Sequence, residues 1–203
     1  LTSSAFVTGC LGALPSFIAS VLLEKSGVGF FQKIDQDTKL YVVQLFGADR
    51  NLPVLPLFPP LYAGFFEELL FRGVIQQWLL PLIGAWPALG TTSVLFGLAH
   101  NPVPGASSFT EACYGANFGL LYMMSGGNIF VPIVAHIVYD LLTFVEVHNR
   151  ATAQLQLTLK GRLPEDRKVK SEIILGLPEK FVDMCYAVFK QLDLDGNGVI
   201  DQQ

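Results

Sequence analysis

Residues 4–23, SAFVTGCLGALPSFIASVLL, form an uncharged run of twenty residues. As a helix rising about 1.5 Å per residue, this run is long enough to cross a hydrocarbon core about 30 Å thick. It lacks a basic N-terminal flank and a clear cleavage site, so a membrane span is favoured over a cleaved signal peptide. Of the 203 residues, 51% are hydrophobic and 15% are charged, as is typical of a membrane protein.

Charge and cysteine content argue against several other classes of protein. The net charge is -4, and no basic stripe with interleaved aromatic residues is present, so nucleic acid is not expected as a partner. Cys10, Cys113 and Cys185 are scattered without CxxC spacing, which indicates neither a disulfide framework nor a zinc ribbon. Because the chain does not begin with Met, we expect a targeting segment upstream.

Proline and glycine positions predict an all-α fold: a polytopic transmembrane helix bundle with a small soluble helical tail. A charged connector over 24–40 follows the first span, and the apolar segment 40–46 is too short to form another. Pro81 is expected to end the first helix of the motif region, and the Gly126-Gly127 pair the third. The four helices predicted after the connector cover residues 60–80, 87–100, 111–125 and 128–147.

Ionisable residues within these apolar helices predict a functional site, because such groups are costly in a membrane and normally face a protein interior or a water-filled cavity. Short connections make neighbouring helices antiparallel. Glu67, His100 and Asp140 are therefore each expected about 18–20 Å from the same set of turns, at one depth. Apart from Tyr and Cys, the ionisable residues between 52 and 145 are Glu67, Glu68, Arg72, His100, Glu111, His136 and Asp140.

Two pairs with i,i+4 spacing are expected in this set. Glu68 and Arg72 can form an internal ion pair, which leaves Glu67 free to project elsewhere, and His136 lies one turn from Asp140. A carboxylate beside an imidazole can act as a general base for water. A second histidine with an aspartate can donate hydrogen bonds to the oxyanion that forms when water attacks a carbonyl. The set predicts peptide-bond hydrolysis, whereas Glu111 is interpreted as an acidic residue near a helix N-terminus.

Three short motifs carry a family resemblance. EELLFR (67–72), FGLAH (96–100) and HIVYD (136–140) resemble, in this order, the EExxxR, FxxxH and HxxxN/D motifs of the CPBP intramembrane proteases. This family includes the type II CAAX prenyl endopeptidases and bacteriocin-processing proteins. The resemblance covers residues 52–147.

The resemblance implies a role for each motif residue. The glutamate and histidine of the first two motifs would activate the attacking water without a cofactor, and the last motif would stabilise the oxyanion. Many CAAX endopeptidases have Asn where this chain has Asp140, so a carboxyl there would act protonated or through water. The implied catalytic residues are Glu67, His100, His136 and Asp140, and the implied supporting residues are Glu68 and Arg72.

The same four catalytic candidates also allow a different prediction, a zinc site, because histidine and carboxylate are zinc ligands. No HExxH motif is present in the sequence to favour it.

The tail carries a second signal. DLDGNGVID (193–201) resembles the first half of an EF-hand loop and predicts a calcium site. The predicted domains are a transmembrane protease domain over 1–149 and a soluble tail over 150–203, with the partial EF-hand at 179–203. We expect the end of this hand and its partner hand to lie outside the chain. The candidate ligands are Asp193, Asp195, Asn197, the carbonyl of Val199, and Asp201.

The sequence therefore predicts an intramembrane endopeptidase in the lipid bilayer, with a peptide or a membrane protein as substrate. One alternative is a catalytically idle accessory or scaffold subunit of a larger membrane complex, for example a photosynthetic one. Another is a calcium-responsive membrane adaptor.

The distribution of Lys and Arg residues predicts on which side of the membrane each connection lies. Outside the spans they fall in the connector 24–59 and the tail, whereas the turns 81–86 and 126–127 carry none. The positive-inside bias places the tail in the cytosol or the plastid stroma. EELLFRG and FGLAH resemble the bacterial and plastid branch of the family. The expected location is the plastid (thylakoid) membrane, with the tail on the stromal side.

Overall fold

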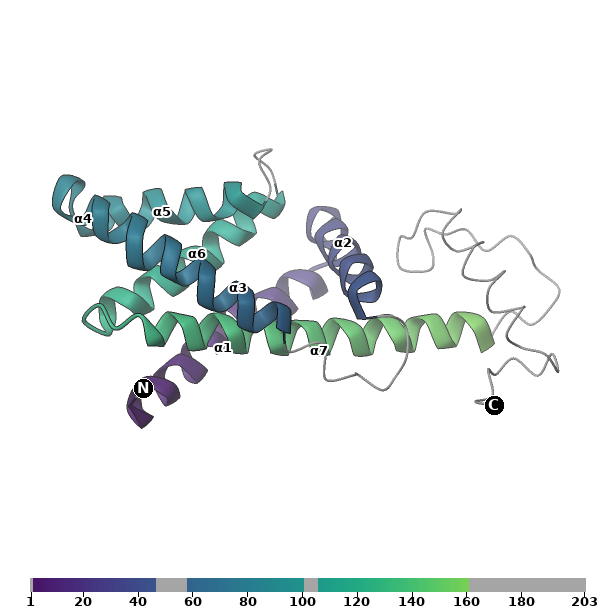
Figure 1. The fold of residues 1–203 in the computed structure, drawn as a ribbon. Coiled ribbons are helices and arrows are strands. Elements are labelled where there is room, and N and C mark those ends of the chain that lie inside the picture. Colours follow the sequence, from purple (N-terminus) through teal and green to yellow (C-terminus); the bar gives the residue numbers. More distant parts are fainter. Residues whose placement is uncertain (1, 47–57, 101–105, 161–203) are drawn as a thin grey trace. The chain divides into compact units, whose positions relative to one another are not determined.

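The computed structural model describes residues 2–46, 58–100 and 106–160, and every regular element in these ranges is a helix (Figure 1). The all-α prediction is confirmed for this part of the chain. The described residues fall into two compact units. The first holds residues 2–34, 58–100 and 106–145, and the second holds 35–46 and 146–160.

The first unit contains the motif region. It holds two helices that pass the length and hydropathy test for a membrane span, Ser3–Lys25 and Phe130–Ala153, although the second continues past the unit's end. The elements in chain order are α1 (Ser3–Lys25), α2 (Gly29–Phe46), α3 (Phe58–Glu68), the π-helix η2 (Leu69–Gln76), α4 (Gln77–Ile83), α5 (Ala85–His100), α6 (Ala106–Met124) and α7 (Phe130–Lys160).

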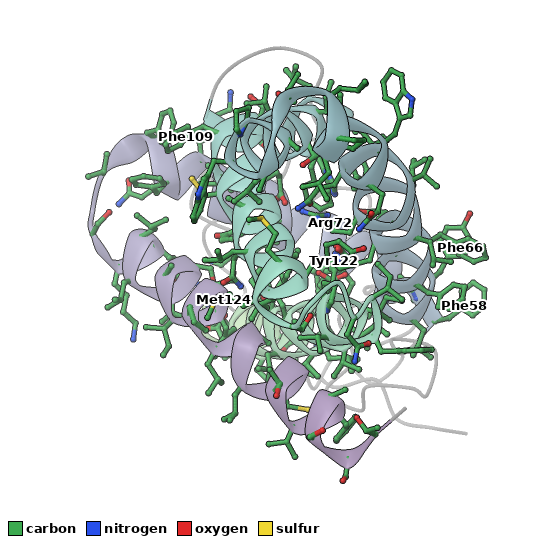
Figure 2. All side chains as sticks on the ribbon, turned by 90° about the vertical axis from the view of Figure 1, so that its left-hand side faces the viewer. Phe58, Phe66, Arg72, Phe109, Tyr122 and Met124 are labelled. Atoms are coloured by element: carbon green, nitrogen blue, oxygen red, sulfur yellow. The ribbon has the colours of Figure 1, made fainter. Side chains whose placement is uncertain are left out.

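Side chains in the first unit are arranged as expected for a helix bundle in lipid. Figure 2 shows Phe58 and Phe66 projecting away from α3, and their exposed fractions are 71% and 53%. Arg72 points inward and is fully buried. Exposed aromatic rings around a buried charge are unfavourable in water but suit a bilayer, where lipid covers the rings.

Small residues bring α1 close to α6 and α7. Atoms of Val134 and Leu121 lie so near Gly9 and Gly12 that a Cβ at either glycine would collide with them. Asn117 of α6 donates hydrogen bonds to the Gly12 carbonyl at 2.9 Å and to Ser16 Oγ at 3.0 Å. Close approach at small residues, with polar side chains bonding across helices, is the usual packing mode in membranes.

Two helix ends differ from the prediction. The helix that carries the first motif does not stop at Pro81. It continues as α4 to Ile83 and is capped by Gly84, whose φ of 87° is a conformation that glycine adopts readily. The last helix, predicted to end at 147, extends to Lys160 because no Pro or Gly interrupts residues 133–160.

The charged connector also differs from expectation. Part of it and the apolar segment after it form one helix, α2, over Gly29–Phe46. The turn before α2 contains Gly27, with a φ of 74°, and no Pro or Gly follows between residues 30 and 46. Charged residues do not prevent a helix when nothing else breaks it.

Gly97 and Gly90 of α5 provide a matched test of the α5–α6 packing. A Cβ at Gly97 would collide with the Ser108 carbonyl oxygen and lie 2.9 Å from the Ala112 nitrogen, whereas at Gly90 it would meet nothing within 4 Å. We expect Gly97→Ala to lower the free energy of unfolding by about 1–3 kcal/mol. Gly90→Ala should leave it unchanged or raise it by up to about 1 kcal/mol. Thermal unfolding in detergent measures both, and equal effects would contradict this packing.

Candidate active site

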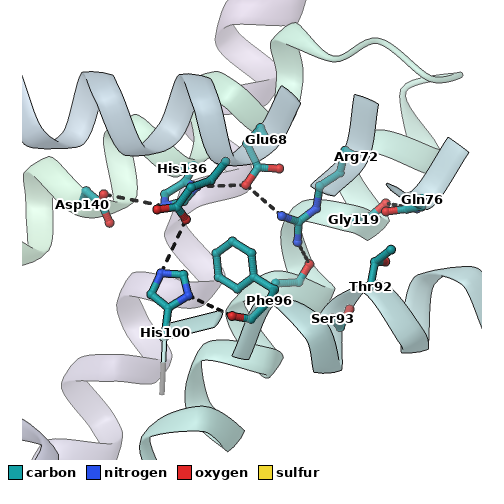
Figure 3. Close-up of polar contacts among 12 residues, drawn as sticks. Glu68, Arg72, Gln76, Thr92, Ser93, Phe96, His100, Gly119, His136 and Asp140 are labelled. Carbon is teal, nitrogen blue, oxygen red and sulfur yellow. Dashed lines mark hydrogen bonds and ion pairs between the residues drawn. The ribbon is translucent and has the colours of Figure 1, made fainter. Parts of the chain in front are cut away.

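Six of the ionisable motif residues come together inside the first unit (Figure 3). The sequence predicted that residues from three helices would meet at one depth. The contacts between them show this convergence. The residues are Glu67 and Glu68 at the end of α3, Arg72 in η2, His100 at the end of α5, and His136 and Asp140 in α7.

The π-helix η2 aligns the polar residues that follow the first motif. Its hydrogen bonds run from i to i+5, so each turn holds more residues than an α-helical turn. Residues four apart therefore lie nearer to a single line along the helix. Glu68, Arg72 and Gln76 have this spacing, and all three are buried. The π-helix therefore continues, through Arg72 and Gln76, a buried polar stripe that begins with Glu68 at the end of α3.

Glu68 is the centre of a buried network. Its Oε1 accepts hydrogen bonds from Arg72 Nη1 at 3.0 Å and from His136 Nδ1 at 2.9 Å. Arg72 Nη2 also donates to the carbonyl of Gly115 in α6. The predicted Glu68–Arg72 ion pair is confirmed, but the bond to His136 was not predicted. Through Glu68, the network joins η2 and α6 to α7.

Aromatic rings surround this network. The Arg72 guanidinium carbon lies 4.8 Å from the centre of the Phe96 ring. The imidazole of His136 stacks on Phe118, with ring centres 4.7 Å apart and planes at 14°. These rings exclude water from the ion pair and fix the plane of the His136 imidazole.

Glu67 faces His100 on the other side of the site. Glu67 Oε2 lies 3.5 Å from His100 Nε2, and each side chain is 32% exposed. The other ring nitrogen, Nδ1, is 2.9 Å from the Phe96 carbonyl oxygen. A carbonyl only accepts hydrogen bonds, so Nδ1 must donate, and a neutral His100 directs its Nε2 lone pair toward Glu67.

Glu67 Oε2 is buried and has no hydrogen-bond partner among the described residues. Its distance to Nε2 is too long for a hydrogen bond. A carboxylate oxygen and an imidazole lone pair are both acceptors, so the pair is arranged to receive a donor such as water.

His136 and Asp140 are neighbours on α7, as the i,i+4 spacing predicted. His136 Nε2 lies 3.6 Å from Asp140 Oδ2, beyond hydrogen-bond distance. His136 Nδ1 is held by Glu68. Nε2 is therefore oriented by the network, and it can donate to another acceptor when the imidazole is protonated on both nitrogens.

Glu111 belongs to this site, contrary to the sequence interpretation. Helix α6 begins at Ala106, so Glu111 lies in its second turn, beyond the first turn where the helix dipole acts. Its carboxyl interacts electrostatically with His100, His136 and Glu67. The signal that could have identified it is its presence as an ionisable residue in an apolar helix.

Metal sites receive no support from this geometry. Within the described ranges, no group of three His, Cys, Asp or Glu side chains could hold a metal ion. Zinc at Glu67, His100, His136 and Asp140 stays a prediction, and of these residues His136 already bonds to Glu68 through Nδ1. Calcium also stays a prediction, because all the EF-hand candidates lie outside the described residues. These candidates are Asp193, Asp195, Asn197, Val199 and Asp201.

A comparison with known protein families matches the region that contains the three motifs. Residues 49–142 match the model of the family described as type II CAAX prenyl endopeptidase Rce1-like. This Rce1-like segment contains all three motifs, so the predicted resemblance to CAAX endopeptidases is confirmed over it. Two helices of the described residues, Ser3–Lys25 and Phe130–Ala153, are also long and apolar enough to cross a membrane.

The Rce1-like segment also has a bacterial relative. Over 93 residues, the chain is 34% identical to the uncharacterized protein YpbD of Bacillus subtilis (strain 168). The match covers 45% of this chain and 44% of YpbD, so the chain spans less than half of that relative's length. No solved structure matches the chain.

Proposed function

We propose that this chain is an intramembrane endopeptidase in which Glu67 and His100 activate water. The observation that carries the proposal is the buried, unpartnered Oε2 of Glu67, 3.5 Å from an imidazole nitrogen that acts as an acceptor when neutral. A water that donates to these two atoms becomes a stronger nucleophile toward a peptide carbonyl. Glu67 takes the proton as the water attacks and returns it to the departing amine.

The oxyanion formed in this attack needs hydrogen-bond donors. His136 supplies such a donor when its ring is protonated, because Nδ1 donates to Glu68 at 2.9 Å and Nε2, which makes no short bond to Asp140, then carries a second N–H. Such a preorganised donor stabilises charge that develops only in the transition state. In this proposal, Arg72 and Glu68 act by holding His136 in place.

One observation favours a second candidate function. The Glu68–Arg72 network bonds to the backbone of α6, so it would stabilise the bundle even in a catalytically idle scaffold. A calcium-responsive adaptor stays a prediction because the EF-hand candidates lie outside the described residues. The plastid location also stays a prediction, because it rests on the wording of two motifs alone.

Peptide cleavage by the purified protein in lipid vesicles distinguishes the endopeptidase from the scaffold. The substrates are prenylated CAAX peptides and unprenylated peptides of varied sequence, with products identified by mass spectrometry. We expect the wild-type protein to cleave at least one substrate and His100→Ala to cleave it about 10² to 10⁴ times more slowly. Equal cleavage by both would contradict the proposed site, and cleavage by neither would favour the scaffold.

Asp140 provides a sharper test of the oxyanion step. An amide N–H donates a hydrogen bond at any pH, whereas a carboxyl donates only when protonated. We expect Asp140→Asn to keep activity within about tenfold of wild type or to raise it. Asp140→Ala should lose about 10² to 10³ in kcat. If Asn and Ala were equally inactive, Asp140 would act as a carboxylate and not as a donor.

A further inference from the structure

Glu111 is the only charged residue of α6. It is half-buried, and among the residues that the structure describes it has no ion-pair partner. The bundle places this charge beside the proposed catalytic residues, although no step of the proposed hydrolysis uses it.

The contacts of its neighbours show which side of α6 faces the site. Arg72 donates to the carbonyl of Gly115, and Phe118 stacks on His136. Residues three and four apart share a helix face. Because Glu111 lies four residues before Gly115, it occupies the same face one turn nearer the start of α6. Its carboxyl interacts electrostatically with both site histidines.

Charge compensation in the site is incomplete. Arg72 compensates Glu68, while Glu67 and Asp140 each face a histidine. The carboxyl of Glu111 is the fourth acidic group, and these pairings leave no cation to compensate its charge. With Asp140 protonated and His100 neutral, as the proposed mechanism requires, three ionised glutamates face two cations, Arg72 and a protonated His136, so the site stays negative. A negative site with low-dielectric walls attracts cations and repels anions.

We propose that Glu111 determines substrate specificity by selecting peptides with a lysine or arginine side chain next to the cleaved bond. This inference rests on the endopeptidase function proposed above. A substrate cation would supply the missing counter-charge, and an acidic residue at the same place would be repelled.

A set of matched peptides tests whether Glu111 selects a basic residue beside the cleaved bond. They are acetylated at the amino terminus and differ only in one residue beside the cleaved bond, which is Lys, Gln or Glu. We expect wild-type kcat/KM to be about tenfold higher for the Lys than for the Gln peptide, about the value of one charge-assisted hydrogen bond. Glu111→Gln should remove this preference, and Glu111→Lys should favour the Glu peptide. Glu146→Gln, which removes an acid of α7 that pairs with Arg150 and lies six residues beyond Asp140, should leave the preference unchanged.

Two results would overturn the proposal. One is a Glu111→Gln variant with the wild-type order of preference, which would mean that Glu111 carries no charge that the substrate senses. The other is an equal loss for all three peptides, which would mean a role in the chemistry common to every substrate.

Peptide binding distinguishes a failure of this inference from a failure of the proposed endopeptidase function. Fluorescence anisotropy measures the affinity of the same peptides for His100→Ala, which keeps every carboxyl of the site, and for the His100→Ala/Glu111→Gln double variant. If no protein cleaves but only His100→Ala binds the Lys peptide about tenfold more tightly than the Gln peptide, the selection stands and the endopeptidase function fails. If cleavage occurs and both variants bind the Lys and Gln peptides equally, the selection alone fails.

Discussion

Replacing Arg72 with alanine is expected to lower the free energy of unfolding by about 3–5 kcal/mol, because it leaves the carboxylate of Glu68 buried without its cation. Both side chains are fully buried, and Glu68 also holds His136 at 2.9 Å. The variant should therefore give little folded protein, and what folds should hydrolyse peptides slowly. Folded yield and the midpoint of thermal unfolding in detergent measure the effect.

The Arg150–Glu146 pair serves as a control, because it has the same residue types and the same i,i+4 spacing as the Arg72–Glu68 pair. Both of its side chains are more than a quarter exposed. A partly exposed helical pair contributes much less than a fully buried one, so Arg150→Ala should lower the unfolding midpoint much less than Arg72→Ala. If Arg72→Ala were as stable as Arg150→Ala, the buried network would not support the bundle.

Replacing Glu67 with glutamine is expected to reduce peptide cleavage by about 10² to 10⁴ while leaving the fold intact. Glutamine has nearly the shape of glutamate but is not a base. Glu67 Oε2 makes no hydrogen bond within the described structure, so no packing contact depends on its charge. Initial cleavage rates and the unfolding midpoint of the same preparation check both parts. Full activity in this variant would rule out Glu67 as the general base.

Part of the site could be predicted from spacing alone. The i,i+4 rule placed Arg72 beside Glu68 and His136 near Asp140, and antiparallel helices of similar length brought Glu67 to His100. These features depend on helix periodicity and on the glycine and proline residues that interrupt the helices. Both can be read from the sequence.

The remaining features depend on three-dimensional packing. The bond from His136 to Glu68 joins residues 68 positions apart, and no local pattern encodes it. Helix η2 was missed because no simple sequence pattern distinguishes a π-turn from an α-turn. Glu111 was assigned to a helix start because α6 begins five residues earlier than the glycines and prolines suggested.

A double-mutant cycle on Glu67 and His100 tests most directly whether the two residues act on one water. Cleavage rates are measured for wild type, Glu67→Gln, His100→Ala and the double variant. Residues that work as a unit show strongly non-additive losses. If both activate the same water, the double variant should be no slower than the slower single variant. Losses that multiply in the double variant would show that the two residues act independently, and would contradict the proposed mechanism.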